Sequence, residues 1–247
     1  MEPTNCYEDS RRAEAYSKLE FPGTYYLAFR DLPQILRRHV SGRNALDFGC
    51  GAGRSTRFLQ QLGFQAVGID VSADMIRKAK EIDPQGDYRL IGDDDAAPLV
   101  SGAYDVVLAA FTFDNIPNDE TRARTFLRLQ RLLAPGGCIV SVVSSPEIYL
   151  HEWASFSTRD FPENQQARNG DTVRIIITDI DDSRPVEDVV CTEEAYLQIF
   201  QSAGLDLVAE YRPLGREDEP YRWINETRIA PWVIHVLQRS VSRSPAR

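Results

Sequence analysis

Residues 45–53 read ALDFGCGAG, a short apolar run that leads into a turn with three glycines. Glycine in such a turn lets backbone N–H groups approach a ligand at the start of the following helix. A P-loop would continue as GxxxxGK[ST], and no lysine follows this turn. A dinucleotide fingerprint, GxGxxG, would place its third glycine where Arg54 stands. The observed spacing is GxGxG, which predicts a different kind of ligand site after the first strand of a sheet.

Outward from this turn, short β-branched runs alternate with helical patterns, which is typical of a parallel sheet wound with helices. Strands are expected at residues 44–49, 65–70, 88–92, 104–111, 138–145, 205–212 and 231–238. Helices are expected at residues 54–63, 73–82, 119–133 and 192–204. Ser72 is placed to cap the second of these helices. The pattern therefore predicts an α/β fold with a doubly wound sheet.

The same alternation divides the chain into parts. Residues 42–144 are expected to form the ligand-binding core, and residues 191–240 to complete its sheet. The segment at 145–190 breaks the rhythm and contains one strand-like run, TVRIIITDI, so it is interpreted as a cap inserted after the fifth strand. Residues 1–41 are expected to form a helical lid. The small, polar tail at 241–247 is expected to be flexible.

Two aspartates accompany the glycine turn. Asp47 stands two residues before the GxGxG spacing, and Asp70 ends the next predicted strand. With these acids the sequence resembles the class I S-adenosylmethionine-dependent methyltransferases. The resemblance covers residues 42–143 and runs, in the family's order, through LDFGCGAGRST, GIDVSADMIRKAK, LIGDDDAAPL, YDVVLAAFTFDNIPN and LLAPGGCIVSVV. It implies a Rossmann-like sheet of seven strands, mostly parallel, with the last strand antiparallel.

This resemblance implies S-adenosyl-L-methionine as cofactor and S-adenosyl-L-homocysteine as product. An acid near the glycine turn suits a zwitterionic sulfonium, whereas it would repel a pyrophosphate. Asp47 is accordingly expected near the ammonium group, and Asp70 is expected to accept hydrogen bonds from both ribose hydroxyls. The other cofactor-binding residues that the resemblance implies are Gly49, Cys50, Gly51, Gly53, Val71, Ser72, Met75, Asp93, Asp94, Ala110, Tyr16 and Tyr25.

The residues themselves leave alternatives open. Asp47 could instead cap the turn that follows it, Met75 could be a core residue, and residues 93–95 could be a solvated loop. Two other functional classes also compete with methyl transfer. One is a protein that binds the cofactor without transferring its methyl group, and the other is a nicotinamide oxidoreductase, which Arg54 disfavours.

Charge and motifs favour a small organic acceptor. The net charge of −9 and the isoelectric point near 4.9 disfavour binding to nucleic-acid phosphates. By resemblance, Asp114 and Asn115 lie above the reactive methyl group, and the Asn-Pro-Pro-Tyr or Asp-Pro-Pro-Tyr motif of several DNA and protein methyltransferases is absent there. No apolar run approaches the roughly 18 residues that would cross a membrane, so no membrane partner is expected.

Methyl transfer is expected to proceed by in-line displacement, for which the protein chiefly aligns the reactants and excludes water. A general base is optional. If the acceptor is a hydroxyl or a carbon acid, the candidates for taking its proton are His151, Asp114 and Glu226. His151 follows the fifth predicted strand closely, although a single histidine is more often structural or exposed.

The cap and the loop at 213–230 are expected to set acceptor specificity, because variable loops at the ligand end of a rigid scaffold usually do so. Their aromatic residues would wall an apolar pocket, and nearby polar residues would face the acceptor. These candidates are Tyr149, Trp153, Phe156, Tyr221, Trp223, Asn115 and Arg228. The aromatic residues could equally pack the cap onto the sheet or form the contact of a homodimer.

The cysteines and the first residues indicate the compartment. Cys6, Cys50, Cys138 and Cys191 lack CxxC spacing, which favours unpaired thiols over a metal site or disulfides. The initial stretch, MEPTNCYEDSRRAEAY, is polar and acidic, unlike the basic and then apolar start of a signal peptide. Both features predict a cytoplasmic protein.

Overall fold

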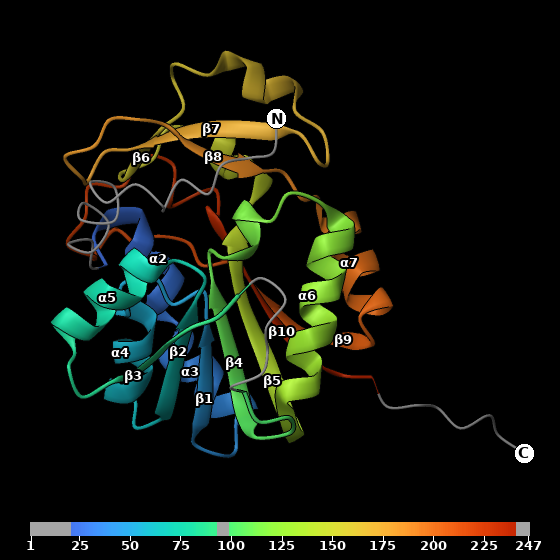
Figure 1. Ribbon diagram of the computed structural model, residues 1–247. Coiled ribbons are helices and arrows are strands. Elements are labelled where there is room, and N and C mark those ends of the chain that lie inside the picture. Colours follow the sequence, from blue (N-terminus) through green and yellow to red (C-terminus); the bar gives the residue numbers. More distant parts are fainter. Residues whose placement is uncertain (1–20, 93–98, 241–247) are drawn as a thin grey trace, which may run out of the picture.

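A seven-stranded sheet forms the centre of the molecule (Figure 1). The computed structural model describes residues 21–92 and 99–240. The strands are β1 (Asn44–Phe48), β2 (Gln65–Asp70), β3 (Asp87–Leu90), β4 (Tyr104–Ala110), β5 (Leu133–Ser144), β9 (Leu205–Tyr211) and β10 (Trp232–Arg239). Their order is β3-β2-β1-β4-β5-β10-β9, and β10 is antiparallel to both of its neighbours. The predicted Rossmann-like sheet, mostly parallel with its last strand antiparallel, is confirmed.

The central strands β1, β4 and β5 are buried on both faces, which explains their nearly continuous apolar sequences. Leu46 of β1 is in register with Val107 of β4, which in turn is in register with Ile139 of β5. These side chains belong to the apolar core on one face. Ala45 and Val106, one residue earlier on their strands, belong to the core on the opposite face.

Helices cover both faces (Figure 1). The face of Ala45 is covered by α2 (Gly23–Arg30), α3 (Leu32–His39) and α4 (Arg54–Gln61), and the face of Leu46 by α6 (Asp119–Leu132) and α7 (Glu193–Ser202). Helix α5 (Ala73–Ile82) packs its Ile76 and Ala79 with Tyr88 of β3. Ser72 caps α5, as predicted, by accepting a hydrogen bond from the Met75 backbone at 3.3 Å.

The segment after β5 contains a second, smaller sheet, which lies above the ends of the core strands (Figure 1). Its antiparallel strands are β6 (Phe156–Ser157), β7 (Thr172–Ile177) and β8 (Val186–Val189). Single turns of 3₁₀-helix are η2 (Phe113–Asn115), which follows β4, η3 (Pro146–Tyr149) and η4 (Pro162–Gln166). The sequence predicted only the strand at 172–180. The other two strands were missed because two to four residues are too short to show an alternating pattern.

The start of β5 also differs from the prediction. The strand begins at Leu133 rather than at 138, and its pairing with β4 shifts register between Tyr104 and Val106. Gly137 lies at this irregularity, where a Cβ atom would stand 2.7 Å from the Tyr104 carbonyl oxygen. The chain can therefore continue as a strand through a sequence, APGG, that normally indicates a turn.

Three further observations bear on the sequence predictions. Among residues 21–92 and 99–240, no helix is long and apolar enough to cross a membrane. Cys50, Cys138 and Cys191 are free and buried thiols, as predicted. The predicted lid at 1–41 corresponds, within its described part, to α2 and α3.

Candidate functional site

A cavity of about 790 Å³ lies between the core sheet and the smaller sheet. One end is lined by the turn after β1 and by the end of β2, and the other by η2, the end of β5 and the strands β7 and β8. The cavity adjoins the ends of β1 and β4, where the strand order reverses direction along the sheet. Ligands of open α/β sheets bind at this point.

In the glycine turn, backbone without a side chain lines the first end of the cavity, at Gly49 and Gly51. Gly51 lines the cavity with φ +53°, and a Cβ atom there would meet only the Met75 sulfur, at 4.0 Å. Gly53, with φ +83°, instead lies against protein, because its Cβ atom would stand 2.7 Å from the Tyr88 ring. Gly51 therefore leaves space for a ligand, whereas Gly53 permits close packing of the turn.

Asp70 is held rigidly at the end of β2 and lines the same end of the cavity. Its Oδ2 accepts a hydrogen bond from the Gly51 backbone N–H and its Oδ1 accepts one from the Ser72 N–H, both at 2.8 Å. Burial raises the pKa of the Asp70 carboxyl, against the opposing effect of these donors. A carboxylate oxygen can accept more than one hydrogen bond, so Asp70 can also accept from a pair of ligand hydroxyls.

Arg54 brings a positive charge to this end. It is the first residue of α4 and lines the cavity. Its guanidinium carbon lies 5.1 Å from the ring centroid of Tyr25 and 6.0 Å from that of Phe111. From the sequence, Arg54 only excluded a dinucleotide glycine pattern, and its place in the cavity was not predicted. The signal that could have revealed it was the aromatic run FPGTYYLAF at 21–29, which supplies further rings around the guanidinium.

The other end of the cavity contains a buried carboxylate, Asp114, in η2. Both of its oxygens lie 3.1 Å from the Ser144 backbone N–H, and Oδ2 also accepts from the Ser144 hydroxyl at 2.9 Å. The side chain is 6% exposed. Burial, and next the charge of Asp188, raise the pKa of Asp114 to about 8. Burial therefore favours the protonated form of this carboxyl group.

Asp188 is the second carboxylate of this end. It lies on β8 with its side chain 8% exposed, and it accepts a hydrogen bond from the Tyr149 hydroxyl at 3.1 Å. Within β8, Asp188 follows the buried Val186 by two residues, so both side chains point to the same face of the small sheet, toward the cavity. Sequence reasoning missed Asp188, because the four residues of β8 are too few to show an alternating pattern.

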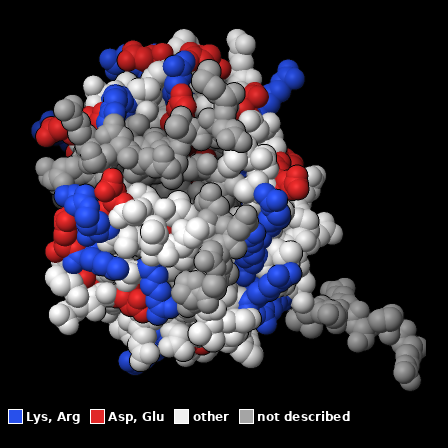
Figure 2. Space-filling view, viewed as in Figure 1, with Lys and Arg blue, Asp and Glu red and all other residues white. Residues whose placement is uncertain are grey.

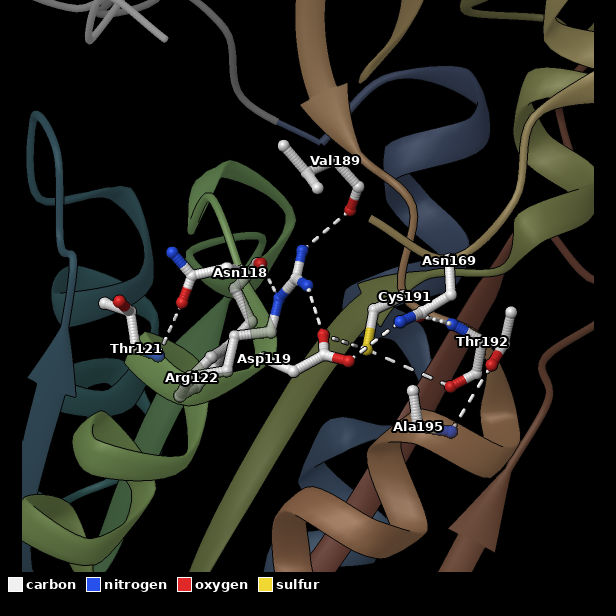
Figure 3. A network of polar contacts seen from close by, with 10 residues as sticks. Asn118, Asp119, Thr121, Arg122, Asn169, Val189, Cys191, Thr192 and Ala195 are labelled. Carbon is white, nitrogen blue, oxygen red and sulfur yellow. Dashed lines mark hydrogen bonds and ion pairs between the residues drawn. The ribbon is translucent and has the colours of Figure 1, made fainter. Parts of the chain in front are cut away.

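A fully buried arginine links the segments that carry the two carboxylates, and Figure 3 shows its bond to the Val189 carbonyl. Arg122 of α6 donates from Nε to the Phe113 carbonyl at 3.2 Å and from Nη2 to the Val189 carbonyl at 2.7 Å. Its Nη1 bonds to Asp119 at 3.0 Å. Phe113 precedes Asp114, and Val189 follows Asp188. One side chain thus joins η2, β8 and α6 around the inner end of the cavity.

Aromatic side chains form the wall between the two ends. The Tyr25 ring centroid lies 5.0 Å from that of Phe156 and 5.8 Å from that of Trp232. Phe111 stands 4.7 Å from Trp232 and has a left-handed backbone, with φ +64°. Such a conformation in a bulky residue is strained and is found most often at functional sites. The rings and four aliphatic side chains make the wall apolar: Ile148, Ile175, Ile177 and Val186.

The rim of the cavity carries positive charge although the whole chain is acidic. Arg124 and Arg128 of α6 line the cavity, and Figure 2 shows basic side chains along the side of the molecule where α6 lies. The cavity is thus polarised. Its α6 rim is basic, and its inner end holds the carboxylates of Asp114 and Asp188.

The family described as "Methyltransferase domain" matches residues 46–141, which run from β1 through the glycine turn into β5. In these residues the chain is similar to the class I S-adenosylmethionine-dependent methyltransferases. S-adenosyl-L-methionine is the cofactor of this family, and the residues at the first end of the cavity suit it. Asp70 can accept hydrogen bonds from ribose hydroxyls, Gly51 leaves room, and the Arg54 cation can pair with a carboxylate.

Curated relatives resemble this chain mainly in its core. The ubiquinone biosynthesis O-methyltransferase of Methylococcus capsulatus is 33% identical over 112 residues, which are 43% of this chain and 46% of that protein. The match therefore spans about half the length of that relative. The N-demethylindolmycin N-methyltransferase of Streptomyces griseus is 22% identical over 216 residues, 86% of this chain and 90% of that protein.

Solved structures share the methyltransferase fold over most of the chain. The CcbJ methyltransferase from Streptomyces caelestis superposes with a TM-score of 0.65 and 18% identity, over 93% of this chain and 96% of that one. DesVI from Streptomyces venezuelae superposes with a TM-score of 0.65 and 16% identity, over 94% of this chain and 99% of that one. The likeness to these proteins is one of fold.

Most of the predicted cofactor-binding residues line the cavity. Those that line it are Gly49, Cys50, Gly51, Asp70, Val71, Met75, Ala110 and Tyr25. Gly53 and Ser72 do not; Gly53 packs on Tyr88 and Ser72 caps α5. Tyr16, Asp93 and Asp94 lie outside the described residues.

Asp47 does not reach the cavity, so the prediction that it meets the ligand's ammonium group is wrong in this structure. Its side chain is fully buried beneath the turn, and its Oδ2 accepts hydrogen bonds from the Ser55 and Thr56 hydroxyls at 2.7 and 2.6 Å. Burial raises the pKa of Asp47 to about 6. Asp47 anchors the start of α4, which is close to the capping role that the sequence left open.

Two of the predicted proton acceptors, His151 and Glu226, lie away from the cavity, whereas Asp114 lines it. His151 bonds to Glu147 at 3.0 Å, and its side chain is 35% exposed. Glu226 is completely buried, and its Oε1 accepts from the Thr24 hydroxyl at 2.6 Å and from the Ala154 N–H at 2.7 Å. Its Oε2 accepts from two further backbone N–H groups. Glu226 is a structural clamp, which corrects the prediction.

The predicted acceptor residues divide in the same way. Asn115, Tyr149 and Phe156 line the cavity, whereas Trp153, Tyr221, Trp223 and Arg228 do not. Each of the four has a local partner instead. Trp153 donates to the Ile148 carbonyl, Trp223 to Arg216, Tyr221 to Phe21, and Arg228 to the Asn225 side chain. The loop at 213–230 packs beside α2 and adds no wall to the pocket, contrary to the prediction.

Proposed function

We propose that this chain transfers the methyl group of S-adenosyl-L-methionine to a small organic acceptor by in-line displacement. The observation that carries the proposal is the single cavity that joins the glycine turn and Asp70 to the buried polar residues Asp114 and Ser144. S-adenosyl-L-methionine supplies an activated methyl group, and the thioether that departs from it is neutral. Alignment of the acceptor and exclusion of water are then the main tasks of the protein.

The residues of this chain are assigned to those tasks by their place in the cavity. Asp70 holds the ribose, and Arg54 pairs with the carboxylate of the methionine portion. The apolar wall that includes Tyr25 and Trp232 excludes water, and the small sheet covers the cavity. Asp114 and Ser144, at the ends of neighbouring strands, hold the acceptor.

The names of the relatives support a small acceptor. One relative is an O-methyltransferase of ubiquinone biosynthesis and another is an N-methyltransferase of N-demethylindolmycin, and both names denote small organic molecules. The second match covers most of both chains, including the small sheet. The volume of the whole cavity, about 790 Å³, lies in the range that is typical of small-molecule sites.

Binding of the cofactor tests the proposal first. At a concentration of S-adenosyl-L-methionine about 100 times its dissociation constant, the folded protein should gain about 2.7 kcal/mol in stability. A thermal shift measures this gain. Release of S-adenosyl-L-homocysteine that depends on an added acceptor then distinguishes a transferase from a protein that only binds the cofactor. No shift at saturation would contradict the proposal.

Replacement of Asp70 by Asn should weaken the binding of S-adenosyl-L-homocysteine by roughly tenfold to a hundredfold, because charge-assisted hydrogen bonds to hydroxyls are worth about 1.5–3 kcal/mol. Isothermal titration calorimetry measures the loss. The matched control is Asp74→Asn, which removes the same charge from a residue that pairs with Arg77 on the surface of α5. Equal affinities in the Asp70 and Asp74 variants would exclude the ribose role of Asp70.

A further inference from the structure

We propose that the acceptor is an uncharged, mostly apolar molecule that binds against one apolar face of the small sheet. The inference rests on the proposed methyl transfer and deepens it by naming the chemical class of the acceptor. Phe156, Ile175, Ile177 and Val186 form this surface, the small-sheet face.

The small-sheet face is continuous across all three strands of the small sheet, which lies above the ends of the core strands (Figure 1). Ile175 and Ile177 stand two residues apart on β7, so their side chains point to the same face. Ile175 is in register with Val186 of β8, and Ile177 with Phe156 of β6. Directly opposed residues share a face, and all four line the cavity. The insertion therefore turns a hydrocarbon surface toward the site.

Side chains from outside the small sheet extend the apolar lining. Ile148 and Trp232 line the cavity, and the Trp232 ring centroid lies 5.7 Å from that of Phe156. The polar group of the Trp232 side chain, its indole N–H, already donates to the Thr24 carbonyl at 2.7 Å. A hydrocarbon or aromatic body is buried favourably between these surfaces. A charged group would lose its hydration there, because these side chains, all within the described residues, have no further hydrogen-bonding group to offer.

The ionisable residues at the inner end have partners within the protein. Arg122 donates from Nε, Nη1 and Nη2 to acceptors of the protein itself. Asp188 has partners of its own, which include the Tyr149 hydroxyl at 3.1 Å. Burial and the charge of Asp188 raise the pKa of Asp114 to about 8, so the Asp114 carboxyl group keeps a proton at neutral pH. None of these three described residues therefore requires a ligand of opposite charge.

Neutral groups supply the hydrogen bonds that the inner end offers to a ligand. A protonated carboxyl group, such as that of Asp114, can donate one hydrogen bond. The Ser144 hydroxyl, which donates to Asp114 at 2.9 Å, keeps lone pairs that can accept one. Both residues line the cavity, and a hydroxyl or carbonyl oxygen can bond to them without an ionic partner. One small polar group on an apolar body thus matches the distribution of groups in the cavity.

The test compares three ligands that share one flat hydrocarbon skeleton and differ in charge. The full chain is saturated with S-adenosyl-L-homocysteine and titrated by calorimetry at neutral pH with cinnamyl alcohol, cinnamylamine and cinnamate. At this pH the amine is a cation and cinnamate is an anion. The alcohol is expected to bind at least about tenfold more tightly than either ion, because burial of an unpaired charge costs far more than burial of a hydroxyl.

The other outcomes would overturn the proposal. Tighter binding of the amine would assign recognition to the carboxylates of the inner end, and tighter binding of cinnamate would assign it to the basic rim of α6. Equal affinities for the three ligands, or no binding of the alcohol, would also contradict an uncharged acceptor.

A pair of variants assigns the preference to the small-sheet face. Ile175→Ala should weaken the binding of the alcohol by about fivefold or more, since it removes buried hydrocarbon contact. The matched control is Ile176→Ala, because Ile176 is the next residue of β7, points to the opposite face and is not among the described residues that line the cavity. The control should change this affinity by less than about twofold. Equal effects of the two substitutions would contradict the assignment.

Binding of S-adenosyl-L-homocysteine separates this inference from the proposed function. The turn after β1 and the end of β2 form the first end of the cavity, so Ile175→Ala should keep its affinity for this molecule, which also shows that it is folded. If that affinity is lost, Val186→Ala, which removes fewer atoms from the same face, takes its place. Failure of the wild-type chain to bind S-adenosyl-L-homocysteine would contradict the proposed methyl transfer itself. Normal binding of this molecule without any preference for the alcohol would contradict only the acceptor class.

Discussion

Replacing Asp114 by Asn is expected to stabilise the protein, by an amount that grows as the pH rises from about 4 to about 8. Burial and the charge of Asp188 raise the pKa of Asp114 to about 8 in the folded state, whereas an unfolded chain releases this proton near pH ~3.9. Between these values the unfolded chain has lost a proton that the folded chain retains, so the free energy of unfolding falls as the pH rises. Asn has no proton to release.

The stabilisation at the upper end of this range should be on the order of a few kcal/mol, since each pKa unit corresponds to about 1.4 kcal/mol. Asn has nearly the same shape as Asp and can still accept a hydrogen bond from Ser144. Urea unfolding at several pH values measures the difference between the two proteins. Asp47 also has a raised pKa, but it is present in wild type and in Asp114→Asn, so its contribution to the pH dependence cancels when the two proteins are compared.

The control for this prediction is Asp74→Asn, because Asp74 lies on the surface of α5. Its effect on stability should be small at every pH. A difference between wild type and Asp114→Asn that stays constant with pH would contradict the pKa assignment. We also expect the variant to lose activity, since a group that is costly to stability within a cavity is commonly retained for function.

The Glu226→Ala variant is expected to lose about 3–5 kcal/mol of stability. The buried carboxylate accepts hydrogen bonds from Thr24, Ala154, Ile224 and Asn225, at distances from 2.6 to 3.1 Å. Alanine would leave one hydroxyl and three backbone N–H groups without this acceptor. Each unsatisfied donor costs about 1–3 kcal/mol, less where water enters the space.

Chemical denaturation measures the loss, and Glu217→Ala serves as the control because Glu217 is exposed in the same loop. The loss of stability in Glu226→Gln should lie between the losses in Glu226→Ala and Glu217→Ala, since an amide keeps one accepting oxygen. Because Glu226 joins α2 to the segment that begins the small sheet, the Ala variant should also make the α2 backbone exchange its amide hydrogens faster. A loss below about 1 kcal/mol would show that the clamp is not needed.

The sequence predicted the core of the fold well because the relevant signals are local. The central parallel strands of the core are short apolar runs, and Ser72 and Gly63 mark helix ends by their own preferences. The cofactor end of the cavity follows from the same pattern, since the turn after β1 and Asp70 at the end of β2 lie side by side once the strands pair.

The acceptor end could not be predicted in the same way, because residues far apart in the chain form it. Asp114 and Asp188 meet only after the small sheet has formed, and β6 and β8 are too short to recognise from their residues. The chemical type of a residue also does not determine whether it faces the cavity. His151 and Glu226 can accept protons, but the direction of a side chain depends on packing, and both turn to partners outside the cavity.

The buried position of Arg122 limits how the small sheet can be exchanged between related proteins. The small sheet is an insertion between two core strands, so exchanging it between related enzymes would seem a simple way to alter what they methylate. Its strand β8, however, is fastened through the Val189 carbonyl to an arginine that belongs to the core helix α6 (Figure 3). A graft would have to bring Arg122 and Asp119 with it, so the unit of exchange is the insertion together with the first turn of α6.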